Sequence, residues 1–280
     1  MNIENTLSTA IKTLNKFNIK SSYLDSELLL SKAINRDRKY FILNSQKKLK
    51  SKQLNYFNNL IDRRKKGEPI AYILKKKEFW KGNFYVDKNV LIPRPDTELI
   101  IDKLIKFSSN KSGLHVLDIG TGSGCILLSF LKEKPNFYGT GIDISLKSIN
   151  ISKYNAKMHK LTNRVKFYNS DIDNFNLGKY DMIVSNPPYI KVNKLKYLER
   201  DVQDFEPKLA LSGGLDGFSE IRKVINKSAI LIKRNGKFIL EIGFDQKSKV
   251  EKLLKKKGFY INKVFKDYGK NDRCIVSTKL

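Results

Sequence analysis

The fold of this chain is decided by residues 116–124, which read Val-Leu-Asp-Ile-Gly-Thr-Gly-Ser-Gly. The apolar start predicts a strand buried on both faces, and the glycines predict a sharp turn into a helix. Glycine at such a turn lets the backbone approach a ligand closely and allows dihedral angles that a Cβ would block. The stretch therefore predicts a strand–turn–helix unit with a ligand site at its turn.

The chain repeats this pattern from residue 112 onward. Alternating strands and helices of this kind are typical of an α/β fold whose mostly parallel sheet is covered by helices on both faces. We expect strands at residues 114–118, 137–143, 165–169, 180–185, 237–242, 260–265 and 274–277. We expect helices after Gly124 and at residues 149–160, 218–232 and 246–257.

The first part of the chain, residues 1–75, carries apolar side chains at helical spacing. This predicts a small all-α bundle. It contains neither a glycine loop nor a cluster of titratable groups, so we assign it to substrate or partner binding. The next residues, 76–95, change to strand-like spacing and predict a β-hairpin linker. The remaining part, residues 96–280, would then be the catalytic domain, opening with a helix that Asp96 or Thr97 could cap.

Composition narrows the class of protein. With 280 residues and 40% hydrophobic residues, the chain can build a real core and is not a disordered polymer. No uncharged apolar run approaches the roughly 18 residues that a membrane span needs, and residues 1–10 lack the apolar centre of a signal peptide. We therefore expect a soluble, cytoplasmic protein.

The formal net charge of +27 suggests an anionic partner, nucleic acid included. Lysine is spread along the whole chain, however, together with abundant Asn and Ile. AT-rich coding produces this composition without any selection for binding. A solvated lysine coat is therefore the favoured explanation, and nucleic-acid binding is the alternative.

The cysteines and histidines give no sign of a metal or redox site. Cys125 and Cys274 lie far apart in the sequence and belong to no spaced pair, so we expect buried thiols. His115 and His159 likewise have no ligand-like spacing. We expect no metal.

Acidic residues around the glycine turn suggest which ligand it binds. Asp143 ends the second expected strand, where a carboxylate can accept hydrogen bonds from both hydroxyls of a ribose. A glycine turn alone would fit a dinucleotide equally well. Asp118 can pair with an ammonium group, which S-adenosylmethionine offers and a pyrophosphate does not. Asp171, after the third strand, could meet an adenine amino group or simply cap a turn.

The strand at residues 180–185 stops at Asn186-Pro187-Pro188-Tyr189. Each proline fixes its own φ and holds the preceding residue extended, so this tip is stiff. A planar NH2 group would find two acceptors there, the Asn186 side-chain oxygen and the Pro187 carbonyl, with Tyr189 as a wall. The alternative is that the prolines simply end the strand and that the tip has no catalytic role.

With both motifs the catalytic half resembles class I S-adenosylmethionine-dependent methyltransferases, and the whole chain resembles the release factor glutamine methyltransferase family. More specific stretches that carry the resemblance are residues 67–72, 78–80, 91–98, 205–207, 210–211 and 267–269. No motif of the family is missing. One departure is Ile172, where some members have an aromatic residue, so adenine packing there could differ.

The resemblance implies a Rossmann-like, seven-stranded methyltransferase sheet with its last strand antiparallel, behind a helical domain that helps to grip the substrate. It also implies methyl transfer from S-adenosylmethionine, without a metal, to the side-chain nitrogen of the glutamine in the Gly-Gly-Gln motif of class 1 peptide chain release factors. By resemblance, Asn186 and Pro187 are catalytic, and Asn186, Pro187, Pro188 and Tyr189 receive the glutamine. The expected cofactor residues are Asp118, Gly120, Thr121, Gly122, Ser123, Gly124, Asp143, Asp171, Ile172 and Asn186.

Two other functions remain open from the sequence. Methyltransferases that act on the exocyclic amino groups of adenine or cytosine in nucleic acid also use Asn-Pro-Pro-Tyr. The charge favours that alternative, whereas the lack of a separate target-recognition domain disfavours it. The other is a noncatalytic basic protein that binds RNA or ribosomes, which the intact motifs disfavour. We expect a monomer.

Overall fold

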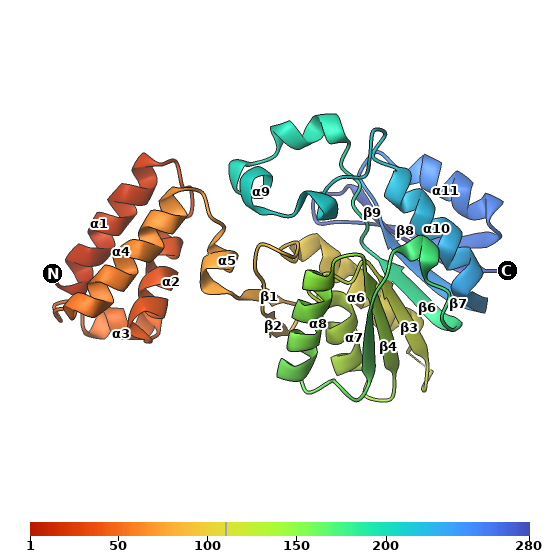
Figure 1. Cartoon of the computed structure of the whole chain (residues 1–280), viewed down its shortest axis with the longest axis horizontal. Coiled ribbons are helices and arrows are strands. Elements are labelled where there is room, and N and C mark those ends of the chain that lie inside the picture. The colour runs from red at the N-terminus through yellow and green to blue at the C-terminus, as the bar shows by residue number, and fades with distance from the viewer. Residues whose placement is uncertain (110) are drawn as a thin grey trace. The chain divides into compact units, whose positions relative to one another are not determined.

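The computed structural model describes residues 1–109 and 111–280, and these form two compact units (Figure 1). The helical unit consists of Met1–Lys75 and Glu199–Phe205, and the sheet unit consists of Lys76–Leu198 and Glu206–Leu280. The hairpin region belongs to the sheet unit, and Glu199–Phe205 is grouped with the helical unit.

The helical unit confirms the expected small bundle. Its helices are α1 (Ile3–Lys16), α2 (Ser22–Ile34), α3 (Arg38–Leu43), α4 (Ser51–Lys65), α5 (Ile70–Leu74) and α9 (Arg200–Phe205). Asn2 begins α1, because its side chain accepts a hydrogen bond from the Asn5 backbone. Helices α1, α2 and α4 pack around fully buried side chains such as Leu14, Leu29 and Leu60.

The sheet unit contains the expected seven-stranded sheet. Its strands are β3 (His115–Ile119), β4 (Tyr138–Asp143), β5 (Val165–Asn169), β6 (Tyr180–Ser185), β7 (Ile232–Glu241), β8 (Phe259–Lys266) and β9 (Asp272–Lys279). Their spatial order is β5-β4-β3-β6-β7-β9-β8. Strand β9 is antiparallel to both neighbours, whereas β3 to β7 are parallel to one another. A separate hairpin is formed by β1 (Lys77–Phe79) and β2 (Gly82–Phe84).

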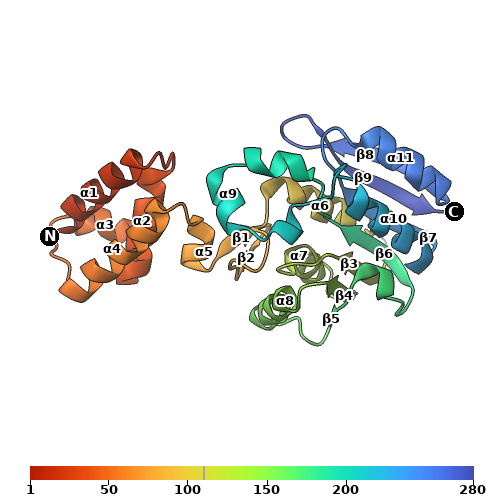
Figure 2. The ribbon, with the colours of Figure 1, turned by 45° about the horizontal axis from the view of Figure 1, so that its top comes forward.

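Helices cover both faces of this sheet (Figure 2). One core contains side chains of the hairpin, α6 (Glu98–Phe107) and α7 (Cys125–Glu133), and α8 (Leu146–Met158) adds Ala156 to it. The other contains side chains of α10 (Ser219–Leu231) and α11 (Lys247–Lys256). Neighbouring residues Val116 and Leu117 of β3 enter different cores, which explains why the central strands are apolar throughout.

Short 3-10 helices complete the unit, namely η1 (Pro95–Thr97), η2 (Ile172–Asn174), η3 (Val192–Tyr197) and η4 (Lys208–Ala210). Two expectations need correction. Strand β7 begins at Ile232 rather than at residue 237, so the preceding helix stops at Leu231. Thr97 occupies the position before α6, but neither it nor Asp96 caps that helix with its side chain. The Thr97 hydroxyl instead accepts a hydrogen bond from Asn186.

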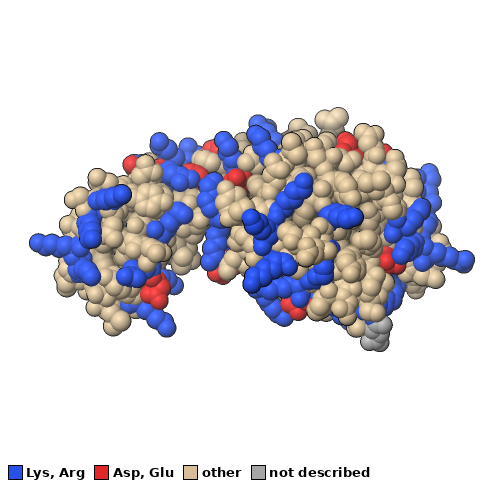
Figure 3. Space-filling model, turned by 60° about the horizontal axis from the view of Figure 1, so that its bottom comes forward, with Lys and Arg blue, Asp and Glu red and all other residues tan. Residues whose placement is uncertain are grey.

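Among the described residues no helix combines the length and apolarity that crossing a membrane requires. Lys and Arg side chains are spread over the face drawn in Figure 3, with some Asp and Glu between them.

Candidate active site

A cavity of about 210 Å³ lies in the sheet unit, at the carboxyl ends of β3, β4 and β6. The parallel strands of an α/β sheet bring the loops that follow them to one edge, where ligands bind. Residues expected at the site that line this cavity are Gly120, Gly122, Asp143, Asp171, Ile172, Asn186, Pro187 and Pro188. The glycine turn and the start of the Asn-Pro-Pro-Tyr tip therefore face the same space.

The glycines of the turn are needed for two different structural reasons. Gly120, Gly122 and Gly124 all have positive φ, at 75°, 55° and 79°. A Cβ added at Gly120 or Gly122 would meet nothing within 4 Å, so the backbone there is bare toward open space. A Cβ at Gly124 would lie 3.0 Å from Leu128 and 3.2 Å from Ser152. The first two glycines keep the turn accessible to a ligand, and the third allows close packing.

Asp143 ties the end of β4 to the glycine turn. Its two carboxylate oxygens accept hydrogen bonds from the backbone N–H groups of Gly122 and Ser145, both at 2.9 Å. Burial raises the pKa of this carboxyl, and the two backbone donors oppose that effect. Each oxygen still has a lone pair to offer, so the carboxylate can also accept the two hydroxyls of a ribose.

Asp118 lies behind the turn rather than on the cavity wall. It is fully buried, and its Oδ2 accepts a hydrogen bond from the Thr121 hydroxyl at 2.7 Å. Its Oδ1 is buried without a hydrogen-bond partner among residues 1–109 and 111–280. Burial raises the pKa of Asp118 to about 7, and the charge of Asp143 adds to this. A buried acid with an unused oxygen is suited to a nearby cation.

Asp171 both begins the 3-10 helix η2 and lines the cavity. Its side chain accepts a hydrogen bond from the Asp173 backbone at 2.8 Å and so begins η2. Asp171 and Ile172 also line the cavity. The two interpretations left open by the sequence are therefore compatible.

The Asn186 side chain has a defined orientation. Its Nδ2 donates to the Thr97 hydroxyl oxygen at 3.0 Å. The amide nitrogen is thereby engaged, and Oδ1 is the atom left to accept a hydrogen bond from a ligand. Pro188 has no N–H, so the Pro187 carbonyl has no donor in the following peptide.

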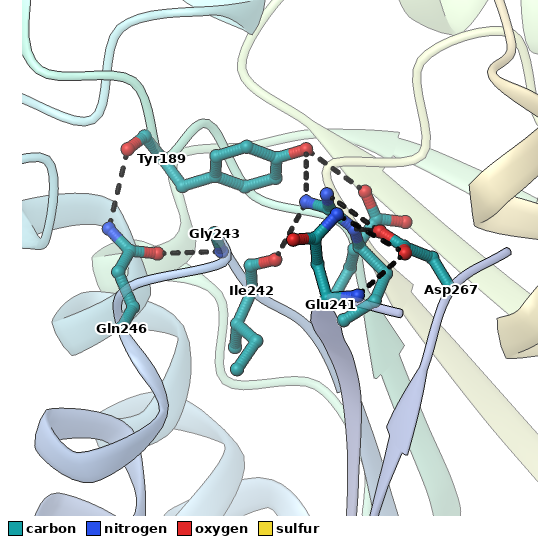
Figure 4. Close-up of polar contacts among 8 residues, drawn as sticks. Tyr189, Glu241, Ile242, Gly243, Gln246 and Asp267 are labelled. Carbon is teal, nitrogen blue, oxygen red and sulfur yellow. Dashed lines mark hydrogen bonds and ion pairs between the residues drawn. The ribbon is translucent and has the colours of Figure 1, made fainter. Parts of the chain in front are cut away.

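Tyr189 does not line the cavity, in contrast to the expectation that its ring forms a wall. The ring packs against the core that α10 and α11 share with the sheet. Figure 4 shows its hydroxyl pointing toward Glu241, to whose Oε1 it donates at 3.3 Å. Arg273 donates to the same hydroxyl at 3.3 Å, and Gln246 donates to the Tyr189 carbonyl at 3.3 Å. Tyr189 is thus the anchored end of the tip.

The loop after α9 forms another part of the cavity wall. Pro207, Leu209 and Ala210 line the cavity. Buried Glu206 fixes this loop, because its carboxylate accepts hydrogen bonds from the Ile92 backbone at 3.2 Å and from Arg94 at 2.5 Å. Residues 206–207 and the stretch 91–98, all of which carry the family resemblance, therefore meet beside the cavity.

The side chains that support the tip were not expected from the sequence; they are Thr97, Glu241, Gln246 and Arg273. Glu241 carried a signal, because it is an acid between Leu240 and Ile242 at the end of an apolar strand. Cys125 and Cys274 are buried free thiols, as expected. Within the described part of the chain no group of His, Cys, Asp and Glu is arranged to hold a metal ion.

Two family models and several known proteins match this chain. Residues 5–74 match the model of the PrmC N-terminal domain, and residues 95–215 match the methyltransferase small domain. The chain is 37% identical to a release factor glutamine methyltransferase of Buchnera aphidicola, over all of this chain and 99% of the relative. It is 36% identical to a bifunctional methyltransferase of Rickettsia conorii, over 98% of this chain but only 57% of that longer relative.

Solved structures share the fold. A methyltransferase from Pyrococcus furiosus matches 70% of this chain and 88% of its own, with a TM-score of 0.52 and 19% sequence identity. At this identity the match concerns the arrangement of helices and strands.

Proposed function

Because this chain belongs to the release factor glutamine methyltransferase family, we propose that it methylates the glutamine side-chain nitrogen in the Gly-Gly-Gln motif of class 1 peptide chain release factors. The methyl donor is S-adenosylmethionine. The observation that carries the proposal is the cavity shared by the glycine turn and the Asn186 amide, whose nitrogen is engaged by Thr97.

The residues around the turn suit this cofactor. Bare backbone at Gly120 and Gly122 would accept close approach, and Asp143 would accept the ribose hydroxyls. Asp171 and Ile172 would flank the adenine. The unused Oδ1 of Asp118 would favour the ammonium group. When bound, the cofactor supplies a methyl group activated by a positively charged sulfur.

The tip would prepare the glutamine. An amide nitrogen is a poor nucleophile because its lone pair is delocalised into the carbonyl. Asn186 Oδ1 and the Pro187 carbonyl would accept the two N–H groups and leave the lone pair facing the methyl group. Both hydrogen bonds strengthen as positive charge develops on the nitrogen, so they stabilise the transition state more than the ground state. The proton can leave after transfer, so no base is needed beforehand.

The same acceptors would reject glutamate. A carboxylate brings no donor to Asn186 Oδ1 or the Pro187 carbonyl, so buried acceptors would face each other unpaired. We assign the helical unit to gripping the protein substrate, in line with its match to the PrmC N-terminal domain.

The test is transfer of a tritiated methyl group from S-adenosylmethionine to an unmethylated release factor. We expect labelling of the Gly-Gly-Gln protein and none of a Gly-Gly-Glu variant. Equal amounts of DNA and RNA serve as rival acceptors. Labelling of nucleic acid but not of the release factor would overturn the proposal in favour of an amino-group nucleic-acid methyltransferase.

A further inference from the structure

A buried lysine joins two parts of the cavity wall without lining the cavity itself. Lys227 of α10 is 7% exposed. Its Nζ donates to the Asp173 carbonyl at 2.8 Å and to the Asn176 side-chain oxygen at 3.0 Å. Both acceptors lie in the segment between β5 and β6, so the ammonium group fastens that segment to α10.

The helix that carries Lys227 forms one side of the cavity. Glu220 and Val224 line the cavity, and Lys227 lies at the i+3 position from Val224. Positions three and four apart share one face of a helix. The face of α10 that forms the wall therefore continues into Lys227.

The segment that Lys227 holds forms another side of the cavity. Asp171 and Ile172 line the cavity, and η2 begins directly after Asp171. The Asp173 backbone is held at both of its polar groups, because its N–H donates to Asp171 Oδ1 at 2.8 Å and its carbonyl accepts from Lys227. The orientation of the Asp171 carboxylate is therefore linked through one residue to the Lys227 ammonium group.

The segment has an apolar anchor of its own, but that anchor does not fix its orientation. Asp173, Asn174 and Asn176 are exposed, whereas Phe175 is buried in the core that α10 and α11 share with the sheet. Apolar contacts such as those of Phe175 are non-directional, so they hold the segment down without setting how it is turned. Hydrogen bonds from a charged donor are directional and stronger than those between neutral groups, so Lys227 supplies the orientation.

We propose that Lys227 is a positioning residue for cofactor binding: it holds η2 so that Asp171 faces the amino group of adenine, and it thereby favours adenine over a base without that group. This inference rests on the proposed function, since the adenine belongs to the cofactor assigned there. It adds a residue on α10, outside the cavity, that sets the preference for the base.

Three variants test this role. Lys227→Met keeps the unbranched apolar stem and removes the donors. It should fold, because its former acceptors belong to exposed residues that water can reach and because the desolvation cost of a buried charge disappears. Asn176→Ala removes one of the two acceptors at an exposed position. Lys179→Met is the matched control, since Lys179 also fastens this segment to α10, through the Ile230 carbonyl, but next to the start of β6, the strand end opposite the cavity.

The measurement is a ratio of two affinities. Calorimetry gives the affinity for S-adenosylhomocysteine and for its analogue in which hydrogen replaces the 6-amino group of adenine. The wild-type protein should bind S-adenosylhomocysteine more tightly, because only its base has the amino group that can donate to Asp171. A general loss of stability lowers the amount of protein that binds but not the ratio of affinities in the folded protein. The ratio therefore separates positioning of Asp171 from a merely structural role.

We expect Lys227→Met to weaken S-adenosylhomocysteine binding by about tenfold, as for one lost hydrogen bond to a charged group, and to change the affinity for the analogue little. Asn176→Ala should shift the ratio in the same direction by a smaller factor. Lys179→Met should bind both ligands as the wild type does. In an Asp171→Ala background, adding Lys227→Met should cause little further loss, because both changes remove the same contact.

Methyl transfer gives a second readout. The KM for S-adenosylmethionine should rise in Lys227→Met, whereas kcat at saturating cofactor should stay near normal, because the tip is unchanged. A fall in kcat with an unchanged KM would contradict a role in cofactor binding.

An unchanged ratio in folded Lys227→Met would overturn the inference, and if that variant does not fold, an unchanged ratio in Asn176→Ala would do so. An equal change of the ratio in Lys179→Met would also overturn it, because any tie between the segment and α10 would then suffice. A further loss of about tenfold in the Asp171→Ala background would show that Lys227 acts elsewhere.

Failure of the proposed function gives different results. A wild-type protein that binds S-adenosylhomocysteine but does not label the release factor would reject the proposed substrate, and the ratio would still decide the role of Lys227. A wild-type protein that does not bind S-adenosylhomocysteine would overturn both proposals.

Discussion

The glycine turn and the Asn-Pro-Pro-Tyr tip line the same cavity but are held in place in different ways. The turn is fixed by its own backbone and by the adjacent strand, since the N–H groups of Gly120 and Thr121 both donate to the Ile142 carbonyl at 2.9 Å. The tip is held by side chains that come from distant parts of the sequence, among them Thr97 and Glu241. The glycine turn, where we propose that the cofactor binds, is therefore held by backbone contacts with the next strand, whereas the tip proposed for catalysis is held by side chains dispersed along the chain.

The largest expected effect is on turnover, when an acceptor of the tip is removed. Asn186→Ala removes one of the two proposed acceptors and should lower kcat by about 10²-fold or more. Cofactor affinity should fall much less than turnover, because the conformation of the glycine turn does not depend on the Asn186 side chain. Methyl transfer to a release factor and calorimetry with S-adenosylhomocysteine measure the two effects. A folded variant with normal turnover would refute the mechanism.

Asp143→Ala should have the opposite profile. It removes the proposed ribose acceptor and the acceptor of the Gly122 N–H, so cofactor affinity should fall by about 10- to 100-fold, as for lost hydrogen bonds to a charged group. Turnover at saturating cofactor should suffer less. Calorimetric titration with S-adenosylhomocysteine checks the effect, and unchanged affinity would reject the ribose assignment.

We expect the proposed contact between Asp118 and the ammonium group of the cofactor to make cofactor binding depend on pH. Its pKa is about 7 in the free protein, and a bound ammonium group would lower it. Binding should therefore release a proton near pH 7, and affinity for S-adenosylmethionine should rise as pH increases from 6 to 8, by up to about tenfold. Calorimetry in buffers of different ionisation enthalpy measures the proton. Asp118→Asn should abolish the release, and persistence of the release in that variant would assign it to another group.

The smallest expected effect is a loss of stability when a side chain is added where the glycine turn packs against its neighbours. Gly124→Ala puts a Cβ at a φ of 79° and 3.0 Å from Leu128, so the free energy of unfolding should fall by about 1–2 kcal/mol. Thermal unfolding measures the loss. Gly213→Ala, at a position away from the turn and without a positive φ, would meet the Gly217 and Tyr189 backbones at 2.7 and 2.8 Å and should disturb the tip instead.

This difference also explains what could be predicted from the sequence. The strands, the antiparallel last strand and the helical bundle followed from hydrophobic spacing and from the resemblance. The glycine turn and Asp143 could be placed because they occupy fixed offsets along one strand–turn–helix unit. The inward hydroxyl of Tyr189 could not, since its direction depends on Glu241 and Arg273, 52 and 84 positions away.

Thr97 is a second residue whose contact could not be predicted from the sequence. Its position before a helix predicts a cap, which is the ordinary use of threonine there. Tertiary structure overrides this local preference, because β6 brings the Asn186 amide to the Thr97 hydroxyl. The sequence alone does not show which of the two contacts Thr97 makes, because the contact with Asn186 depends on the order of the strands in the sheet.

The place of β9 in the sheet bears on how the protein is made. This strand lies between β7 and β8 although it follows both in the chain, and it carries Arg273 to the Tyr189 hydroxyl. Residues of β9 belong to both cores of the sheet, Cys274 and Val276 to one and Ile275 to the other. A nascent chain on the ribosome therefore lacks part of each core, and the clamp on Tyr189, until this last strand has been made. The sheet unit should reach its folded state only after synthesis of β9.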